Sequence, residues 1–355
     1  MLINKSKSMK NLPLITIAIA TFNSESTLSK TLTSIKNQKY PRQKIEILII
    51  DGGSIDTTLD IARQFNCSVV KNVKTELIYA KHIGYLQAKG VYLIYLDSDE
   101  VLENNDSLRI KINAFQKDTR VKGVMPTGYI TPLNFASINY YINDFGDPFS
   151  YFNYRLSQNA DLYINQLKKR GTIISEDETN VVFNFTSTRP RPMIELMAGG
   201  GMIDLSYFRN RFPEIKTNPS LVAFYFYYLN QDRQFLAVTK NDAIIHYSSG
   251  SLRKYTKKIA SRVKNNIFET DMGKGGFSGR ETFQPQWFRF KKYLFIPYSF
   301  SLILPFIDSL LLLLTRKKAI FLIHTPLCLY TTLLILYYSF LRTFGVKPVI
   351  RTYGN

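Results

Sequence analysis

Two carboxylates spaced two residues apart, Asp97 and Asp99, follow directly after an apolar run of the sequence. Where a strand gives way to a loop, side chains with this spacing can both turn toward one ligand. Their hard oxygen atoms suit Mg²⁺ or Mn²⁺, and such an ion in turn binds a diphosphate. The tripeptide Asp97-Ser98-Asp99 therefore predicts a metal and phosphate site, although a solvated turn after a strand has the same pattern.

Polar residues also follow two earlier apolar runs. Thr21 and Asn23 come after the run Leu14–Ala20, and the stretch Asp51-Gly52-Gly53-Ser54-Ile55-Asp56 comes after the run Ile45–Ile50. The carboxyl ends of parallel strands meet at one edge of a sheet, and ligands bind beyond that edge. The sequence therefore predicts that these polar tips form one site together with Asp97-Ser98-Asp99.

The elements that must position these residues alternate in type over the first hundred residues. Apolar, β-rich runs predict strands, and apolar residues at helical spacing predict helices. Strands are expected at Leu14–Ala20, Ile45–Ile50, Cys67–Val70 and Val91–Leu96, and helices at Ser24–Asn37, Asp56–Phe65 and Glu76–Lys89. Asn23 or Ser24 is expected to cap the first helix, and Gly90 to close the third. This alternation predicts an α/β fold, a mostly parallel sheet with helices on both faces.

In order and spacing, several stretches resemble the family 2 glycosyltransferases, which have the Rossmann-like GT-A fold. The resemblance covers residues 13–105 well and residues 195–262 more loosely. It rests on Ile19-Ala20-Thr21-Phe22-Asn23-Ser24-Glu25, Ile49-Ile50-Asp51-Gly52-Gly53-Ser54-Ile55-Asp56-Thr57-Thr58, Ala80-Lys81-His82-Ile83-Gly84, Ala88-Lys89-Gly90 and Leu96-Asp97-Ser98-Asp99. It implies a metal-dependent transferase that moves a sugar from a nucleotide-diphosphate sugar to an acceptor by direct displacement, which inverts the anomeric centre.

The resemblance also implies a role for each matching residue. Thr21, Asn23 and Glu25 would border the nucleotide, and Asp51 would contact the base. Lys81 would face the nucleotide from a position where the family usually has Arg. Asp97 would lie near the ribose and the metal, and Asp99 would bind the metal directly. His246 stands where many relatives have a histidine that joins the metal or the diphosphate, and imidazole is a competent ligand for such metals. A structural role for this histidine stays open. The implied cofactor is Mg²⁺ or Mn²⁺.

An acceptor hydroxyl would normally need a carboxylate base, and here the sequence departs from the family. Relatives resemble one another in a Glu-Asp pair whose position lands near Leu221 and Val222, where no acid stands. Asp232, Glu214 and Asp177 are weak candidates, and each is equally interpreted as a solvated surface charge. Three explanations stay open: a different alignment, a base from elsewhere, or an acceptor that needs none, such as the anionic polyprenyl phosphate. The alternative function is a catalytically impaired membrane protein that binds nucleotide sugars.

The composition sets outer limits on the fold and the partners. The chain has 355 residues, 45% of them hydrophobic and 21% charged, with a formal net charge of +19. A packed core is therefore feasible, and an anionic partner is expected. The cysteines Cys67 and Cys328 form no CxxC pair, so neither a zinc site nor a disulfide framework is indicated. Nucleic acid is not expected as a partner, because no recognition motif is present and much of the charge lies beside apolar stretches.

The C-terminal part changes character. Ser251–Lys264 is a basic amphipathic segment, and two apolar stretches follow, Tyr293–Leu314 and Ala319–Leu341. Each has about the 20 residues needed to span a bilayer. If both span and the first domain is cytoplasmic, the turn Thr315-Arg316-Lys317-Lys318 faces outside, against the positive-inside tendency. A first stretch that is re-entrant or interfacial would remove this conflict, and both topologies stay open.

These observations predict five parts. They are a basic tail at 1–12, a GT-A domain at 13–250, a basic juxtamembrane segment at 251–292, two hydrophobic membrane segments within 293–341 and a tail at 342–355. The apolar run after the basic tail is too short for a signal peptide, so the GT-A domain is expected on the cytoplasmic side of the membrane. The expected partners are a nucleotide-diphosphate sugar, a lipid-phosphate or glycan acceptor such as a cell-envelope polysaccharide, and the membrane.

Overall fold

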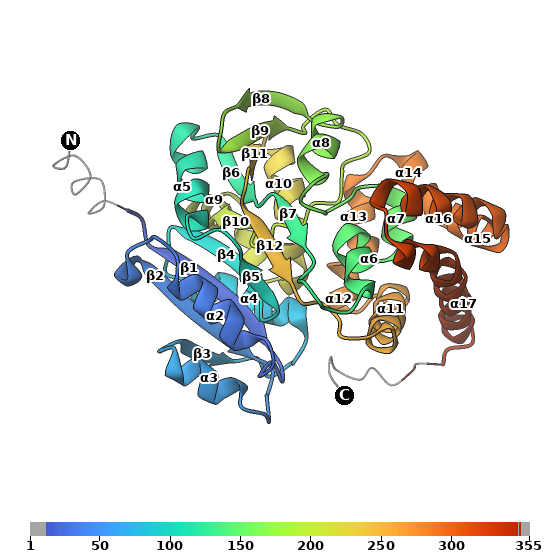
Figure 1. The fold of residues 1–355 in the computed structure, drawn as a ribbon, viewed down its shortest axis with the longest axis horizontal. Helices are drawn as coiled ribbons and strands as arrows, with labels where there is room; N and C mark the ends of the chain where they lie inside the picture. The colour runs from blue at the N-terminus through green and yellow to red at the C-terminus, as the bar shows by residue number, and fades with distance from the viewer. Residues whose placement is uncertain (1–11, 347, 349–355) are drawn as a thin grey trace.

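The computed structural model describes residues 12–346 and residue 348, so most of both predicted tails lies outside the described residues. A nine-stranded sheet has the order β3-β2-β1-β4-β10-β6-β11-β9-β8, and a small three-stranded sheet has the order β5-β12-β7. Helices flank the large sheet, and the C-terminal helices form a layer at the other end of the molecule from β3 (Figure 1). The small sheet lies between the large sheet and these C-terminal helices (Figure 1).

The bounds of the elements are as follows. The strands are β1 (Ile15–Thr21), β2 (Ile45–Asp51), β3 (Ser68–Lys71), β4 (Tyr92–Asp97), β5 (Glu100–Leu102), β6 (Val121–Met125), β7 (Gly128–Ile130), β8 (Thr172–Glu176), β9 (Asn180–Asn184), β10 (Met202–Asp204), β11 (Phe235–Thr239) and β12 (Ala243–His246). The helices used below are α2 (Leu28–Lys36), α3 (Thr58–Gln64), α4 (Leu77–Gln87), α5 (Ser107–Lys117), α6 (Ile138–Phe145), α7 (Pro148–Tyr154), α9 (Leu205–Arg211), α10 (Tyr225–Gln231), α11 (Leu252–Ile267), α12 (Asp271–Lys274), α13 (Phe277–Arg280), α14 (Gln286–Lys291), α15 (Phe295–Phe300), α16 (Ile303–Arg316) and α17 (His324–Thr343), with the short 3-10 helices η2 (Pro213–Lys216) and η3 (Pro219–Phe224).

The predicted order of strands and helices over the first hundred residues is confirmed, and so is the α/β class. Strands β3, β2, β1 and β4 pair in parallel, and in the large sheet only β9 and β10 run against the others. Alternate residues of a strand face opposite sides of the sheet. Ile17 and Ile49 accordingly pack in one hydrophobic cluster, while Ala18 and Ile50 pack in the other.

Two predicted helix ends are wrong. Helix α2 begins only at Leu28, and neither Asn23 nor Ser24 caps it with its side chain. The Asn23 side chain instead accepts a hydrogen bond from the backbone of Ile55, at 2.9 Å. Gly90 does not close α4, whose last residue is Gln87. A Cβ atom on Gly90 would lie 2.5 Å from the backbone nitrogen of Thr16. Glycine is therefore needed here because the backbone passes very close to β1.

Strand β10 brings a later part of the chain to the edge where β4 ends. The two strands are antiparallel, with Met202 opposite Ile94 and Asp204 opposite Tyr92. The chain therefore enters β10 beside the carboxyl end of β4, where Gly200 N donates to the carbonyl oxygen of Tyr95 at 3.0 Å. Residues that follow β10 lie at the opposite edge of the large sheet, where β4 begins.

The two apolar C-terminal stretches differ in shape. Ala319–Thr343 is one helix of 25 residues with a mean hydropathy of 2.0, and in the described part of the chain no other unbroken helix is long and apolar enough to cross a membrane. The first stretch is not one straight helix. Its two halves, Gln286–Phe300 and Ile303–Arg316, meet at 90°, and Leu302 between them has a left-handed φ of 53°.

Helix α4 packs so closely on β1 that only glycine fits at the contact. A Cβ atom on Gly84 would lie 2.7 Å from the Cβ atom of Ala18. We expect Gly84→Ala to push α4 away from the sheet and to lower the free energy of unfolding by about 1–3 kcal/mol. Urea titration measures this change. Gly250→Ala is the control, because no atom lies within 4 Å of its added Cβ atom. Equal stability of both variants would contradict the close packing.

Candidate active site

The polar residues predicted at the ends of β1, β2 and β4 lie at one edge of the sheet. In the parallel register Thr21 lies opposite Asp51, and Ala20 lies opposite Asp97. The Thr21 hydroxyl donates to Asp51 Oδ1 at 3.0 Å. The structure thus brings together the residues that follow β1, β2 and β4, which are far apart in the sequence.

Asp51 shapes the loop that follows β2. Its Oδ2 atom accepts hydrogen bonds from the backbone nitrogens of Gly53 at 2.8 Å and Ser54 at 2.9 Å. Gly53 has a positive φ of 96°, which glycine adopts without strain. The carboxylate is buried and committed to these donors, so Asp51 holds the loop in the shape that a ligand at this edge would meet.

Asn23 and Glu25 tie the loop after β1 to the loop after β2. Asn23 has a positive φ of 47°, and its backbone nitrogen donates to Ser54 Oγ at 2.9 Å. Glu25 Oε2 accepts a hydrogen bond from Thr57 Oγ1 at 2.8 Å. The two loops therefore form one connected wall at the outer side of the edge.

Lys81 of α4 forms an ion pair with Asp97 Oδ1. The Lys81 side chain is only 2% exposed, whereas the Asp97 side chain is 29% exposed. A buried ammonium group needs a compensating partner, and the carboxylate provides it. The pair places a positive charge directly beneath the Asp97-Ser98-Asp99 turn and fixes how Asp97 is presented.

Glu100 is a buried carboxylate that joins three segments at this edge. Its Oε2 atom accepts from the backbone nitrogen of Asp97 at 2.9 Å, and its Oε1 atom accepts from the Tyr129 hydroxyl and from Gly199 N, both at 3.1 Å. Burial, together with the negative charge of Asp97, raises the pKa of Glu100 above its ordinary value. The sequence placed Glu100 at the tip of β4 but indicated no role for it.

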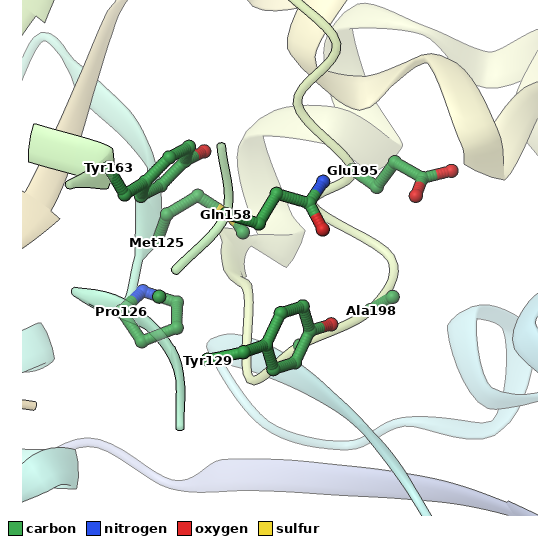
Figure 2. A pocket seen from close by; sticks show the side chains of 9 residues that line it. Met125, Pro126, Tyr129, Gln158, Tyr163, Glu195 and Ala198 are labelled. Atoms are coloured by element: carbon green, nitrogen blue, oxygen red, sulfur yellow. The ribbon is translucent and has the colours of Figure 1, made fainter. Parts of the chain in front are cut away.

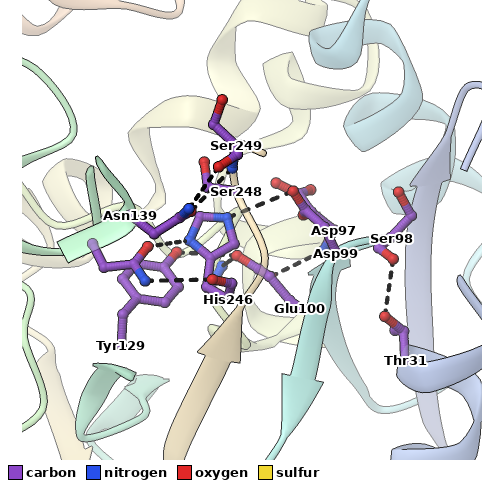
Figure 3. A network of polar contacts seen from close by, with 12 residues as sticks. Thr31, Asp97, Ser98, Asp99, Glu100, Tyr129, Asn139, His246, Ser248 and Ser249 are labelled. Carbon is purple, nitrogen blue, oxygen red and sulfur yellow. Dashed lines mark hydrogen bonds and ion pairs between the residues drawn. The ribbon is translucent and has the colours of Figure 1, made fainter. Parts of the chain in front are cut away.

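His246, the last residue of β12, lies beside Asp99, which directly precedes the neighbouring strand β5 (Figure 3). His246 Nε2 lies 3.8 Å from Asp99 Oδ2, and His246 Nδ1 lies 2.8 Å from Asn143 Oδ1. Asn143 Nδ2 points to Thr131 Oγ1, at 3.1 Å, so its Oδ1 is the atom that receives the Nδ1 proton of the imidazole. Burial lowers the pKa of His246 and favours the neutral ring. The neutral ring then directs the lone pair of Nε2 toward Asp99.

Two acceptors that face each other without a proton between them fit a cation. A histidine whose other ring nitrogen donates to a fixed partner is the usual form of a metal-binding imidazole. Asp99 and His246 therefore fit a divalent ion as a pair. Within residues 12–346, no group of three or more His, Cys, Asp or Glu side chains is placed to hold one. Further oxygens would have to come from water or a bound ligand, as is common for Mg²⁺.

A small pocket with room for about one water molecule adjoins this network (Figure 2). It is lined by Met125, Pro126, Gly128, Tyr129, Gln158, Tyr163, Glu195, Ala198 and Gly199. The Tyr129 ring packs on the His246 ring with 4.8 Å between centroids, while its hydroxyl bonds Glu100. Tyr129 thus lines the pocket on one side and packs against the Asp99–His246 pair on the other.

The structure does not bring Asp232 to this edge, which corrects its candidacy as a base. Asp232 accepts a hydrogen bond from the Tyr207 hydroxyl at 2.7 Å and pairs with Arg211 at 2.9 Å. Both partners belong to α9, which begins beyond Asp204 at the opposite edge of the sheet. Asp232 is therefore a structural acid on the far side of the sheet.

The other two weak candidates also lie elsewhere. Asp177 stands in the turn between β8 and β9 and pairs with Lys117. Strand β9 is four positions from β4 in the sheet, which corresponds to about 19 Å at ~4.8 Å per strand. Glu214 is exposed in η2, which packs on α9 and α4. Val222, where the family pattern would place an acid, is wholly buried in an apolar cluster.

Sequence reasoning missed Asn143 and Tyr129. Asn143 contacts His246 across 103 residues, and no local pattern marks it. The glycine run 199–201 was noted in the sequence without a place in the fold. That run leads into β10 at the edge where β4 ends.

Comparison with known proteins identifies the family of the N-terminal part. The description "Glycosyl transferase family 2" matches residues 16–169. These residues belong to glycosyltransferase family 2. The match contains Asp97, Asp99 and Tyr129 and ends before Glu195 and His246.

Two curated relatives illustrate the likeness. Glycosyltransferase AglE of Haloferax volcanii is 32% identical over 94 residues, which are 25% of this chain and 31% of that protein. The dolichyl N-acetyl-alpha-D-glucosaminyl phosphate 3-beta-D-2,3-diacetamido-2,3-dideoxy-beta-D-glucuronosyltransferase of Methanococcus voltae is 34% identical over 110 residues, 29% of this chain and 34% of that protein. The chain thus matches about a third of the length of each relative.

A solved structure extends the likeness to the whole fold. The mannosyltransferase PcManGT from Pyrobaculum calidifontis, solved in complex with GDP-Man and Mn²⁺, superposes with a TM-score of 0.51 and 12% identity. The match covers 95% of this chain and 92% of that one. This likeness confirms the predicted GT-A fold.

The tautomer of His246 is a direct consequence of the contact with Asn143. We expect neutral His246 to carry its proton on Nδ1, and Asn143→Leu to release that preference. Nitrogen chemical shifts of ¹⁵N-labelled histidine measure the tautomer, and the chain has only 3 histidines to assign. His82 and His324 do not contact Asn143 and are internal controls. An Nε2-protonated His246 in the wild type would contradict the geometry.

Proposed function

We propose that this protein is an inverting glycosyltransferase that moves a sugar from a nucleotide-diphosphate sugar to an acceptor at a membrane surface. The observation that carries this proposal is the convergence of Asp97, Asp99 and His246 at the edge of a family 2 domain. The names of the relatives and the GDP-Man and Mn²⁺ bound by PcManGT support it.

The donor would bind along the wall formed by the loops after β1 and β2. Thr21, Asn23 and Glu25 would border the nucleotide, and Asp51 would present the loop that meets the base. Lys81 would face the nucleotide from below Asp97, where its buried ammonium favours a nearby anion. The connected hydrogen bonds of this wall support a preformed nucleotide pocket.

Asp99 and His246 would hold the Mg²⁺ or Mn²⁺ ion, with Asp97 beside them. Such an ion stabilises the negative charge on a leaving diphosphate. The contribution of the chain is to fix the ligands in advance: Asn143 sets the tautomer of His246, and Lys81 orients Asp97. These contacts support a metal role for His246 over a purely structural one.

The metal role of Asp99 makes a sharp prediction. We expect Asp99→Ala to lower turnover at least about 100-fold in a folded protein, since charge stabilisation of the leaving group is lost. Release of nucleoside diphosphate from GDP-mannose or UDP-glucose with Mn²⁺ measures the rate. Asp60→Ala is the matched control, because Asp60 is exposed and pairs with Arg63 of the same helix. Normal activity of Asp99→Ala would refute the site.

A second candidate is a catalytically impaired protein that binds nucleotide sugars. The apolar burial of Val222, where the family resemblance would place an acid, is the observation that favours it. Isothermal titration with a nucleoside diphosphate and Mn²⁺, combined with the turnover assay, separates the two functions. Binding without turnover supports the impaired protein.

The C-terminal helices present an apolar surface suited to lipid. Exposed large apolar side chains are Trp287, Phe290, Tyr293, Leu294, Phe300, Leu302, Ile303, Leu304, Phe306, Ile307, Leu310, Leu311, Leu314, Leu322, Leu333, Leu336, Tyr337, Phe340 and Phe344. The cations Arg289, Lys317 and Lys318 are exposed among them. Apolar side chains flanked by Lys and Arg favour the interface of an anionic bilayer. We therefore propose this layer, residues 286–344, as the membrane contact.

The basic turn after α16 would stay on the side of the α/β domain. Arg316 Nε pairs at 2.6 Å with Asp144 of α6, whose side chain is 1% exposed, and Lys318 Nζ lies 4.0 Å from the centre of the Tyr140 ring of α6. A turn held against α6 cannot lie across the membrane from it. This supports an interfacial or re-entrant first stretch and agrees with the positive-inside tendency.

Helix α17 is also held along the protein. Tyr330 donates to the carbonyl oxygen of Thr256 at 3.3 Å, and Arg342 Nη1 donates to that of Ile267 at 2.6 Å. Both acceptors belong to α11, the helix that carries Arg253, Lys254, Lys257, Lys258, Arg262 and Lys264. So many cations are too costly to place in hydrocarbon. We therefore propose that α17 lies in the membrane interface beside α11, with the α/β domain on the cytoplasmic side.

This topology predicts that both ends of α17 face the same side of the bilayer. A Cys67→Ser/Cys328→Ser protein with Phe344→Cys, reconstituted into vesicles with the α/β domain outside, should react with a membrane-impermeant maleimide. Phe344 is exposed at the end of α17. Ile173→Cys on β8 is the control for the outside. Labelling at position 344 only after detergent is added would show a spanning helix.

A further inference from the structure

A surface groove lies between the start of α6 and the 3-10 helix η6 (Ala319–Ile323). It has a volume of about 460 Å³ and is lined by Ser137, Tyr140, Lys318, Ala319 and Ile320. We propose that this groove binds the headgroup of an anionic phospholipid. The inference rests on the proposed membrane contact of residues 286–344 and goes beyond it, because it names one lipid-binding site and the class of lipid that fits it.

The groove offers a cation and a hydroxyl group to a ligand. Lys318 Nζ lies 4.0 Å from the centre of the Tyr140 ring, and the Lys318 side chain stays exposed. An ammonium group held over an aromatic ring still has N–H groups to donate to a phosphate oxygen. The exposed Ser137 side chain does not cap α6, so its hydroxyl is a second donor. Together these groups suit a phosphate.

The charge around the groove has one sign. Residues 131–143 and 309–323, which supply its two walls, contain no Asp or Glu, whereas the turn contains Arg316, Lys317 and Lys318. Asp144 follows on α6, but its side chain is 1% exposed and pairs with Arg316 at 2.6 Å. An anion is therefore attracted to the groove and meets no exposed carboxylate in these two segments.

Apolar surface adjoins the groove and selects a lipid over a soluble anion. Leu311 and Leu314 of α16, which precede the basic turn, are 51% and 71% exposed, and Leu322 of η6 is 42% exposed. A soluble anion would gain nothing from these side chains, whereas acyl chains gain by covering them. The volume of the groove also lies within the range of about 300–1,000 Å³ that small-ligand sites usually have. A phospholipid with a negative headgroup fits both the charge and the apolar surroundings.

Helix α6 connects the groove to the candidate active site. Tyr140 lines the groove, while Asn139, the preceding residue, exchanges two hydrogen bonds with the backbone of Ser249, at 2.6 Å and 3.0 Å. Figure 3 shows Asn139 and Ser249 beside His246. A phospholipid held in the groove would therefore fix the distance between the bilayer and His246. An acceptor embedded in the same bilayer would be kept within reach of the site.

Neighbouring lysines provide a matched pair of variants. Lys317 and Lys318 are both exposed, but only Lys318 lines the groove. Each loses one positive charge on substitution by Gln, and one cation near an anionic bilayer contributes about fivefold to binding. Lys318→Gln also loses a charge-assisted hydrogen bond, so we expect it to weaken binding about 50-fold and Lys317→Gln only about fivefold. Co-sedimentation of the purified full-length protein with vesicles of phosphatidylcholine and phosphatidylglycerol measures both.

A third variant fills the groove without changing any charge. Ser137→Trp places a large side chain at one wall, and the exposed Ser137 makes no cap that the substitution would remove. We expect this variant to lose the preference for vesicles that contain phosphatidylglycerol over vesicles of phosphatidylcholine alone. Tryptophan itself favours the bilayer interface, so a general loss of membrane affinity is not the expected result. Thermal unfolding checks that all three variants are folded.

Glycerol phosphate separates a lipid from a free phosphate as the ligand. It carries the charged group of the headgroup but no acyl chains. We expect an excess of it to leave the protein bound to vesicles that contain phosphatidylglycerol, at constant ionic strength. Displacement would show that the groove takes the phosphate group alone.

The outcomes distinguish the groove from the membrane contact beneath it. Equal losses in Lys317→Gln and Lys318→Gln, an unchanged lipid preference in Ser137→Trp, equal binding of the wild type to both kinds of vesicle, or displacement by glycerol phosphate overturns the groove as a phospholipid site. The proposed membrane contact survives each of these results. A wild type that binds neither kind of vesicle overturns both, and glycosyl transfer is tested separately by Asp99→Ala.

Discussion

One buried carboxylate, Glu100, holds the candidate site together. A buried acid must have its oxygens satisfied by protein donors, and each donor is thereby fixed in place. The donors of Glu100 come from the end of β4, from β7 and from the segment before β10. The Asp97-Ser98-Asp99 turn, the Tyr129 wall and the loop that carries Glu195 are consequently parts of one hydrogen-bonded unit.

Around this unit the chain sets its charges in opposed pairs. Lys81 lies beneath Asp97, Arg280 meets Glu195, and the Nε2 lone pair of His246 faces Asp99. A candidate site of this kind is preorganised, because its polar groups are held in position before any ligand binds. The small sheet contributes as much as the large one, since β12 presents His246 directly opposite Glu100 of β5.

The C-terminal helices belong to the same body as the α/β domain. Asp308 of α16 binds Arg155 at the end of α7, and Arg316 binds Asp144 of α6. Helix α6 also carries Asn143, which orients His246. The apolar layer proposed to contact lipid is therefore connected through one short helix to the Asp99–His246 pair that is proposed to bind the metal. Such a connection suits an enzyme whose acceptor is held at a membrane.

The sequence by itself determined the sheet edge and its acids. The strands β1, β2 and β4 and the motif Asp97-Ser98-Asp99 follow from local apolar runs and turn residues, whose physics acts over a few positions. The sequence wrongly predicted that Asn23 begins one helix and that Gly90 ends another, because their actual partners, Ile55 and Thr16, lie on other elements. A side chain that can cap a helix can equally bind another loop, and only the fold decides which bond forms.

Only the tertiary structure decided which later residues join that edge. The sequence supplied Asp232, Glu214 and Asp177 as acids, but the antiparallel entry of β10 brings the glycine run 199–201 to that edge, and Asp232 pairs with α9 at the opposite edge of the sheet. Asn143 and Arg280 act on residues 103 and 85 positions away. Contacts of this length leave no periodic trace in the sequence, because they arise from strand order and helix packing and not from the spacing of neighbours.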